Sequence, residues 1–136
     1  MAAIPVRFLL AVLLLLLLLP EAGCTGAQLE LVPQPLPGDI TVSGKWDSNW
    51  GRLEFIQLGQ QLSGTSDYND CRLEGVVEGD LILFDWEQPG DPSEARQGVS
   101  GKGWFRISQD GQMLDGGWGY GKERAGGGSW HAERVR

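Results

Sequence analysis

A segment of this chain occurs twice, and that repeat limits the possible folds more than any other feature. Shifted by 52 positions, residues 103–116 align with residues 51–64 at six identical positions. The later copy carries Asp110-Gly111 between alternating apolar and polar residues, the pattern of a two-residue hairpin turn, because such turns need positive φ angles. The sequence therefore predicts one β-hairpin used twice.

Glycine-rich turns divide residues 39–136 into short strands, and no window shows a helical period. We predict strands at about 40–48, 52–58, 61–68, 71–78, 80–87, 102–108, 113–120 and 128–135. Tight turns join neighbouring strands, so consecutive strands pair antiparallel. The predicted fold class is all-β, an eight-stranded antiparallel up-and-down meander barrel built from a duplicated four-strand half, since closure removes both sheet edges. A two-sheet sandwich is the alternative.

The N-terminus has the pattern of a secretory signal peptide, which we place at residues 1–24. One positive charge at Arg7 precedes an apolar run over 8–19 that Pro20 ends, and this run is too short for a membrane span. Residues 25–38 carry three prolines and are predicted to form a Pro-rich tether, with the β-barrel domain at 39–136. We expect the mature protein outside the cytoplasm.

The cleavage site leaves two alternatives open. Ala22-Gly23-Cys24 resembles the end of a bacterial lipoprotein signal, although Glu21 stands where that pattern prefers an aliphatic residue. The resemblance implies a lipidated Cys24 and an anchor in a membrane of the cell envelope. Cleavage after Ala27 would instead release a secreted protein. With Cys24 lipidated, Cys71 has no disulfide partner and is expected to be a small buried residue.

Charge and composition argue against several functions. The chain has 18 acidic and 11 basic residues, a formal net charge of -7, so nucleic acid is not an expected partner. We expect no metal, no cofactor and no catalytic activity, because the ligand spacing of a metal site is missing and His131 is the single histidine. Asp85 and Glu87 alternate on one strand; paired-carboxylate hydrolysis is the alternative to a solvated acidic face.

Six tryptophans are many for so small a domain. In the predicted barrel the connections at one end are tight and two at the other end are long, and several aromatic residues fall toward that loop-rich end. We expect a small apolar or aromatic-stacking ligand there. The candidate ligand-binding residues are Trp50, Tyr68, Trp86, Trp118 and Tyr120, with Arg96 and Arg124 from the long loops for a polar end. The alternative is that the indoles fill the interior of a barrel short of leucine and isoleucine.

The first strands also resemble those of known barrels. The similarity to avidins lies in Ser43-Gly44-Lys45-Trp46, Asn49, Gly51 and Gly64-Thr65, and the Gly-x-Trp motif alone is similar to lipocalins. Both are calycin-type up-and-down barrels. The resemblance implies that Trp46 packs against an arginine near the end of the last strand, either Arg134 or Arg136, in a cation-π contact.

The biotin-contacting positions of avidins do not carry over to this chain. Ser48, Arg52 and Ser66 stand where that family has asparagine, serine and tyrosine. The apolar face of this strand also starts at Leu53, two residues after Gly51, so the alternate residues that are predicted to point inward here are not those that contact biotin in avidins. The resemblance therefore supports a fold and not a ligand.

Two functions follow as expectations. The first is a non-catalytic binding module with its ligand in an aromatic-lined mouth. The alternative is an envelope interaction or inhibitor protein that blocks an extracytoplasmic partner enzyme with its long loops. Small barrel lipoproteins that inhibit lysozymes or proteases resemble this chain in size and anchoring, and an acidic domain suits a basic enzyme.

Overall fold

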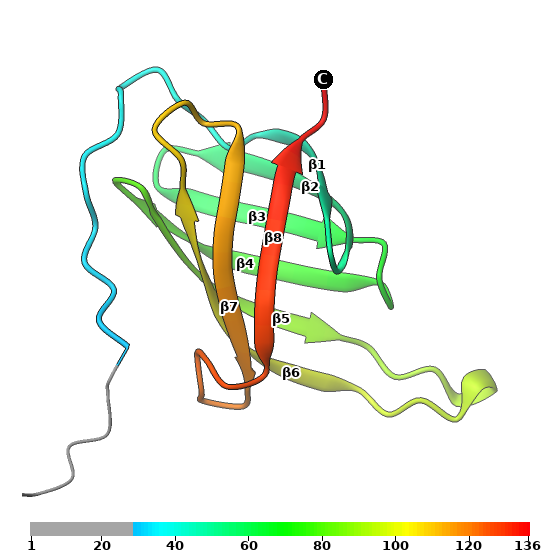
Figure 1. Ribbon diagram of the computed structural model, residues 1–136. Helices are drawn as coiled ribbons and strands as arrows, with labels where there is room; N and C mark the ends of the chain where they lie inside the picture. The colour runs from blue at the N-terminus through cyan, green and yellow to red at the C-terminus, as the bar shows by residue number, and fades with distance from the viewer. Residues whose placement is uncertain (1–28) are drawn as a thin grey trace, which may run out of the picture.

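The computed structural model describes residues 29–136, which form a closed barrel of eight antiparallel strands in up-and-down order (Figure 1). The strands are β1 (Gly44–Ser48), β2 (Gly51–Leu58), β3 (Gln61–Ser66), β4 (Cys71–Glu78), β5 (Leu81–Gln88), β6 (Val99–Ile107), β7 (Met113–Tyr120) and β8 (Gly128–Arg134), with the short 3-10 helix η1 (Pro92–Glu94) between β5 and β6. The last strand closes the barrel by pairing with the first, with Trp46 opposite Arg134. The predicted barrel is thus confirmed, and the alternative of a two-sheet sandwich is wrong.

The first strand is shorter than the predicted 40–48. It starts at Gly44. Just before Gly44, hydrogen bonds between backbone and side chains take the place of the backbone–backbone hydrogen bonds of a strand pair. The backbone N–H of Val42 donates to the Gln57 side chain at 2.9 Å, and the N–H of Gln57 donates to the Ser43 hydroxyl at 2.8 Å. Residues 40–43 therefore follow β2 without pairing to it as a strand.

The two copies of the repeat form the hairpins β2–β3 and β6–β7, but their turns differ. Gly59 and Gln60 make a two-residue turn between Leu58 and Gln61. The predicted two-residue turn at Asp110-Gly111 is wrong: these residues lie in a four-residue loop, closed by a hydrogen bond from Ser108 N–H to the Met113 carbonyl at 2.9 Å. Only Gly111 of that pair has positive φ, whereas a two-residue turn of this type needs it at both positions.

Aromatic rings fill the middle of the barrel. The rings of Phe84 and Phe105 stack with centroids 5.0 Å apart, and Trp130 meets both edge to face. Inward-facing glycines make room for the rings: a Cβ at Gly103 would lie 2.4 Å from the Phe84 ring. The centre of the barrel is therefore packed solid, as protein interiors generally are.

Residues 29–43, called the strap, run along the end of the barrel where the tight turns lie (Figure 1). Gln34 exchanges hydrogen bonds with Asp80 in the β4–β5 turn, donating its N–H to the carboxylate and accepting the N–H of Asp80, both at 2.8 Å. Arg106 holds the same carboxylate at 2.8 Å and donates to the Val32 carbonyl at 2.7 Å. The described part of the Pro-rich segment is thus bound to the barrel rather than projecting from it.

A cation-π contact supports the strap at the other side of this end. The guanidinium carbon of Arg134 lies 4.4 Å from the ring centroid of the fully buried Trp46, the contact expected for these two positions. Arg134 also donates to the carbonyls of Thr41, Ser43 and Gly111. One side chain therefore ties the strap, β1 and the β6–β7 loop together.

The opposite end carries the connections 49–50, 67–70, 89–98 and 121–127, of which the last two are the longest in the barrel. Residues 89–98, called the arm, extend from β5 and β6 away from the barrel, with η1 at the tip (Figure 1). Within residues 29–136 there is no helix of the length and apolar character needed to cross a bilayer. The predicted signal peptide and Cys24 lie outside the described residues.

Candidate functional site

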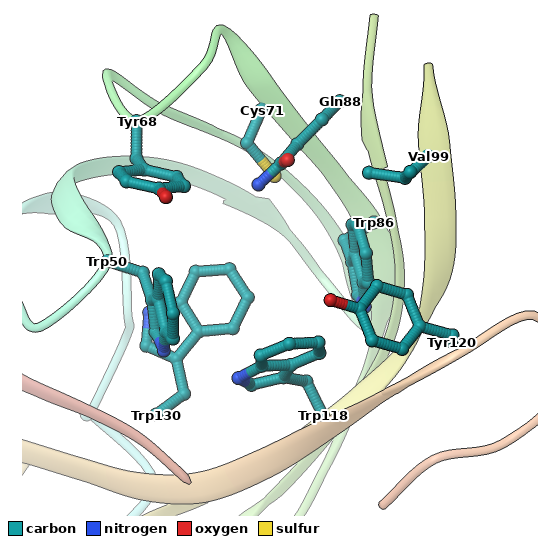
Figure 2. A pocket seen from close by; sticks show the side chains of 9 residues that line it. All are labelled: Trp50, Tyr68, Cys71, Trp86, Gln88, Val99, Trp118, Tyr120 and Trp130. Carbon is teal, nitrogen blue, oxygen red and sulfur yellow. The ribbon is translucent and has the colours of Figure 1, made fainter. Parts of the chain in front are cut away.

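A cavity of about 180 Å³ opens at the loop-rich end of the barrel (Figure 2). Its floor is the packed aromatic centre, and its walls are the strand residues at this end of the barrel and the connections between the strands. The lining residues are Trp50, Tyr68, Cys71, Trp86, Gln88, Val99, Trp118, Tyr120 and Trp130. Strand parity explains the selection, because alternate residues of a strand point into the barrel.

The cavity brings together all five aromatic residues expected at this end. Trp86 lies near the end of β5, and Trp118 and Tyr120 lie at the end of β7. Trp50 and Tyr68 lie in the connections after β1 and β3. The alternative, that the indoles fill the interior, also holds for several tryptophans. Trp46 is buried at the tight end, and Trp86, Trp118 and Trp130 both line the cavity and belong to the buried core.

The rings meet edge to face, so that neighbouring walls of the cavity stand nearly at right angles. Trp118 lies at 89° to Trp50 and at 90° to Trp86, with centroids 5.5 and 5.6 Å away. Trp50 lies at 76° to Tyr68, with centroids 5.2 Å apart. Edge-to-face packing is the favoured arrangement of aromatic pairs because the positive ring edge meets the negative face.

Hydrogen bonds in the wall hold three of the indoles. Trp86 Nε1 donates to the carbonyls of Lys102 and Gly119, both at 3.2 Å, and Trp50 Nε1 donates to the Ser129 carbonyl at 3.0 Å. Trp130 Nε1 donates to the Ser48 hydroxyl at 3.2 Å. The polar edges of these three indoles are therefore used by the protein, whereas Nε1 of the fourth wall indole, Trp118, is buried without a hydrogen-bond partner in the described part of the chain.

Glycine makes room for the cavity rings as it does in the core. A Cβ at Gly101 would lie 2.8 Å from the Trp86 ring, and one at Gly127 would lie 2.4 Å from the Trp118 ring. Side chains at these two positions would push the rings into the cavity. The glycine content that marks turns in the sequence thus also shapes the site.

Cys71 is 2% exposed and borders the cavity. Burial raises the pKa of its thiol to about 11, so that it is uncharged at neutral pH. A neutral buried thiol is a poor nucleophile. This agrees with the expectation of a small buried residue.

Few polar groups reach the cavity. In Figure 2 the Gln88 amide and the hydroxyls of Tyr68 and Tyr120 point into it, and the Gln88 amide lies beside Cys71. The lining set within the described residues contains no charged side chain. The cavity is therefore an aromatic box with a small number of neutral hydrogen-bonding groups at its mouth.

The structure does not bring the two candidate arginines to the cavity. Arg96 donates to the Asn69 side chain at 2.9 Å and to Glu94 at 3.1 Å, which fixes the arm to the 67–70 connection. Arg124 donates to the carbonyls of Phe84 and Gly103. Both guanidiniums therefore have partners in the protein, Arg96 in the connections of this end and Arg124 on the backbone of β5 and β6.

Four lining residues were missing from the sequence-based set: Cys71, Gln88, Val99 and Trp130. Trp130 and Cys71 carry a usable signal, since both alternate with exposed residues on their strands and so face inward. Gln88 and Val99 face each other across β5 and β6 beyond the predicted strand ends. Their inclusion depends on how far that hairpin extends, which the sequence leaves open.

The residues considered for catalysis lie on the outer surface. Asp85 pairs with Lys102 Nζ at 2.7 Å, and Glu87 is exposed on the same face of β5. His131 Nδ1 contacts the Asp115 carboxylate at 2.5 Å, with both side chains more than half exposed. These groups do not border the aromatic cavity. Residues 29–136 hold no group of three side chains suited to a metal ion.

Fold and site together define a closed eight-stranded antiparallel barrel with a strap across one end and an aromatic cavity at the other. No protein-family model matches the chain, and comparisons with curated proteins and with solved structures find no match. The function is therefore argued from the cavity itself.

Proposed function

We propose that this protein is a non-catalytic extracytoplasmic binding module that holds a small ligand in the aromatic cavity. The observation that supports this most directly is the concentration of six aromatic side chains around one opening. A pocket with apolar walls and a few converging polar groups is the usual form of a small-molecule site. Tyr68 and Tyr120 at its mouth are 42% and 59% exposed. Because burying aromatic rings stabilises a fold, rings left exposed around a pocket are consistent with ligand contact.

The size of the cavity limits the ligand. An apolar cavity of about 150 Å³ accommodates benzene, and this one has about 180 Å³. The ligand, or the part of it that enters, is therefore a single compact group and not a long chain. A larger molecule would have to leave its remainder outside the mouth.

Native mass spectrometry of protein recovered from its own host tests the proposal. We expect a stoichiometric adduct of small mass that disappears on denaturation. Tyr120→Leu should lower its occupancy, whereas Lys102→Ala, on the outer surface, should not. Protein that carries no adduct and binds no member of a panel of small aromatic and apolar compounds would contradict the proposal.

We place the protein in the cell envelope, anchored through Cys24 if cleavage follows the lipoprotein pattern. The strap supports this arrangement, because the chain reaches the barrel along the end opposite the cavity (Figure 1). An anchor there would leave the mouth facing away from the membrane. Mass spectrometry of the N-terminal peptide should find diacylglyceryl on Cys24, and Cys24→Ser should release the protein from membranes. An N-terminus at Gln28 would contradict the anchor.

The arm favours a second candidate function, binding of an extracytoplasmic protein such as a partner enzyme. Asp91 and Arg96 exchange backbone hydrogen bonds at 2.8 and 2.9 Å, and the Asp91 side chain caps η1 by accepting from Ser93 at 2.9 Å. A loop braced in this way loses little conformational freedom on binding. Replacing residues 90–97 with Asn-Gly should abolish capture of such a partner while leaving small-ligand binding unchanged.

A further inference from the structure

The cavity walls are aromatic, uncharged and set at right angles to one another, and this combination indicates the charge of the ligand. The inference rests on the proposed function, since it concerns the same cavity. It uses three features: the ring faces, the absence of charge in the lining, and the small number of hydrogen-bonding groups.

Four indoles surround the cavity. In Figure 2, Trp50 and Trp86 stand on opposite sides of the cavity, with Trp118 between them. The ring plane of Trp118 makes angles of 89° and 90° with these two side walls, so it meets each of them edge to face. Ring faces that border the cavity carry the negative side of the ring quadrupole and attract a positive group placed there.

The net charge of the protein also favours a cationic ligand over an anionic one. The chain has a formal net charge of -7. Arg96 and Arg124, the arginines of the two long loops at this end, are bonded to other groups of the protein, and the described lining contains no cation that could pair with an anion. An acidic protein attracts cations toward such a site and repels anions.

Hydrogen bonding distinguishes between kinds of cation. A primary ammonium carries three N–H donors, which would lose their water on entering and find few acceptors among the rings. A quaternary ammonium has no N–H donor and loses less on entering an aromatic box. Its methyl groups also offer the apolar surface that the rings favour.

We propose that the cavity recognises a quaternary ammonium head group, held against the faces of Trp50, Trp86, Trp118 and Trp130. A trimethylammonium group with a short neutral tail is of the right size for about 180 Å³. The tail lies at the mouth, where Gln88, Tyr68 and Tyr120 provide neutral donors and acceptors. The cavity lining within residues 29–136 contains no cation that would favour a carboxylate tail.

Isothermal titration calorimetry with choline and with 3,3-dimethylbutan-1-ol tests the inference, because the two probes share a shape and differ in charge. We expect choline to bind at least tenfold more tightly than the neutral probe, and ethanolamine, a primary ammonium, to bind more weakly than choline. Equal affinity for choline and the neutral probe would overturn the cation inference and leave the proposed function standing. A failure of choline, the neutral probe and indole alike would overturn both.

A second measurement changes the rings without changing their shape. Protein made with 5-fluorotryptophan has less negative ring faces, so its affinity for choline should fall several-fold while its affinity for the neutral probe stays the same. Trp50→Leu should likewise lower the affinity for choline more than the affinity for the neutral probe. Trp104→Leu is the matched control, since Trp104 lies on the outer face of β6 and does not border the cavity. A fluorinated protein that binds choline unchanged would contradict the inference.

Discussion

The two ends of this barrel are finished in opposite ways. At the tight end the strap lies across the turns, its Val42 is fully buried, and Leu36 and Ile40 pack against the core. The buried Asp80 carboxylate there is held by both the strap and Arg106. At the loop-rich end no segment of the described chain covers the opening, and Tyr68 and Tyr120 remain exposed around a cavity.

The difference separates stability from binding. The packed centre and the strap bury the large apolar side chains that hold the fold together, including Trp46, Phe55, Phe84 and Phe105. The exposed rings of Tyr68 and Tyr120 at the mouth add less, because part of their surface remains in water, whereas the cavity walls Trp86 and Trp118 belong to the buried core. Changes at the tight end should therefore lower the free energy of unfolding, whereas changes at the mouth should alter ligand affinity.

The largest effect is expected from Asp80→Ala, which removes the link between strap and barrel. It leaves Arg106 and the Gln34 N–H without their carboxylate. We expect a loss of about 2–3 kcal/mol in the free energy of unfolding, somewhat below the range for a fully buried pair, because the Arg106 side chain is 34% exposed. Urea denaturation measures the change.

Lys102→Ala is the control for this prediction. It breaks an ion pair of similar length with Asp85, but both side chains are more exposed than Asp80. We expect a change below about 0.5 kcal/mol. If the two variants were equally stable, the strap would not contribute to the stability of the barrel.

The next effect concerns Cys71 at the mouth. The unfolded thiol loses its proton near its ordinary pKa of 9.0, and the folded thiol loses it near 11 because burial disfavours the thiolate. Between these values the unfolded state binds fewer protons, so stability falls as the pH rises from 9 to 11. Two pKa units correspond to about 2.7 kcal/mol at most, and we expect about 1–2 because the thiol borders a cavity open to water.

Comparison with Cys71→Ala isolates this contribution, since lysine and tyrosine side chains titrate in the same range in both proteins. Urea denaturation at several pH values should show a shallower decline for the variant. Parallel declines would mean that the folded thiol ionises as an unfolded one does.

The barrel could be predicted from local signals in the sequence. Turn residues and apolar alternation locate all eight strands, because a strand buried on one face must alternate along its length. The loop at Asp110-Gly111 was predicted incorrectly because the Ser108 hydroxyl, which accepts from the N–H groups of Gln112 and Met113, stabilises a longer turn. The strap was not predicted, since its contacts with Asp80 and Arg106 depend on positions distant in the sequence.

The aromatic part of the site could also be predicted, whereas its charge could not. Strand ends and parity place Trp50, Trp86 and Trp118 at one end. Arg96 and Arg124 belong to the same end by topology, but hydrogen bonds to Asn69 and to backbone carbonyls direct them elsewhere. Side-chain direction within a loop follows from such contacts, and no periodic pattern encodes them.

A smaller loss of stability is expected from Arg134→Lys at the tight end. Lysine keeps the positive charge near the Trp46 ring but cannot donate to Thr41, Ser43 and Gly111 at once, because its single ammonium lacks the fork of the guanidinium. We expect a loss of about 1 kcal/mol. Thermal unfolding measures it, and a variant as stable as the parent would show that the charge alone matters.

The smallest change in stability is expected from Tyr120→Leu, which tests the mouth directly. The Tyr120 side chain is 59% exposed, so the substitution should alter the free energy of unfolding by less than about 0.5 kcal/mol. Phe105→Leu, at a fully buried ring in the barrel centre, should cost about 1 kcal/mol or more. Affinity should show the reverse order: Tyr120→Leu weakens ligand binding severalfold, because Tyr120 itself lines the cavity, and Phe105→Leu weakens it less, because Phe105 reaches the cavity only through its contact with Trp130. If Tyr120→Leu instead lowered stability as much as Phe105→Leu, the mouth rings would belong to the core, and the division between a stabilising end and a binding end would be wrong.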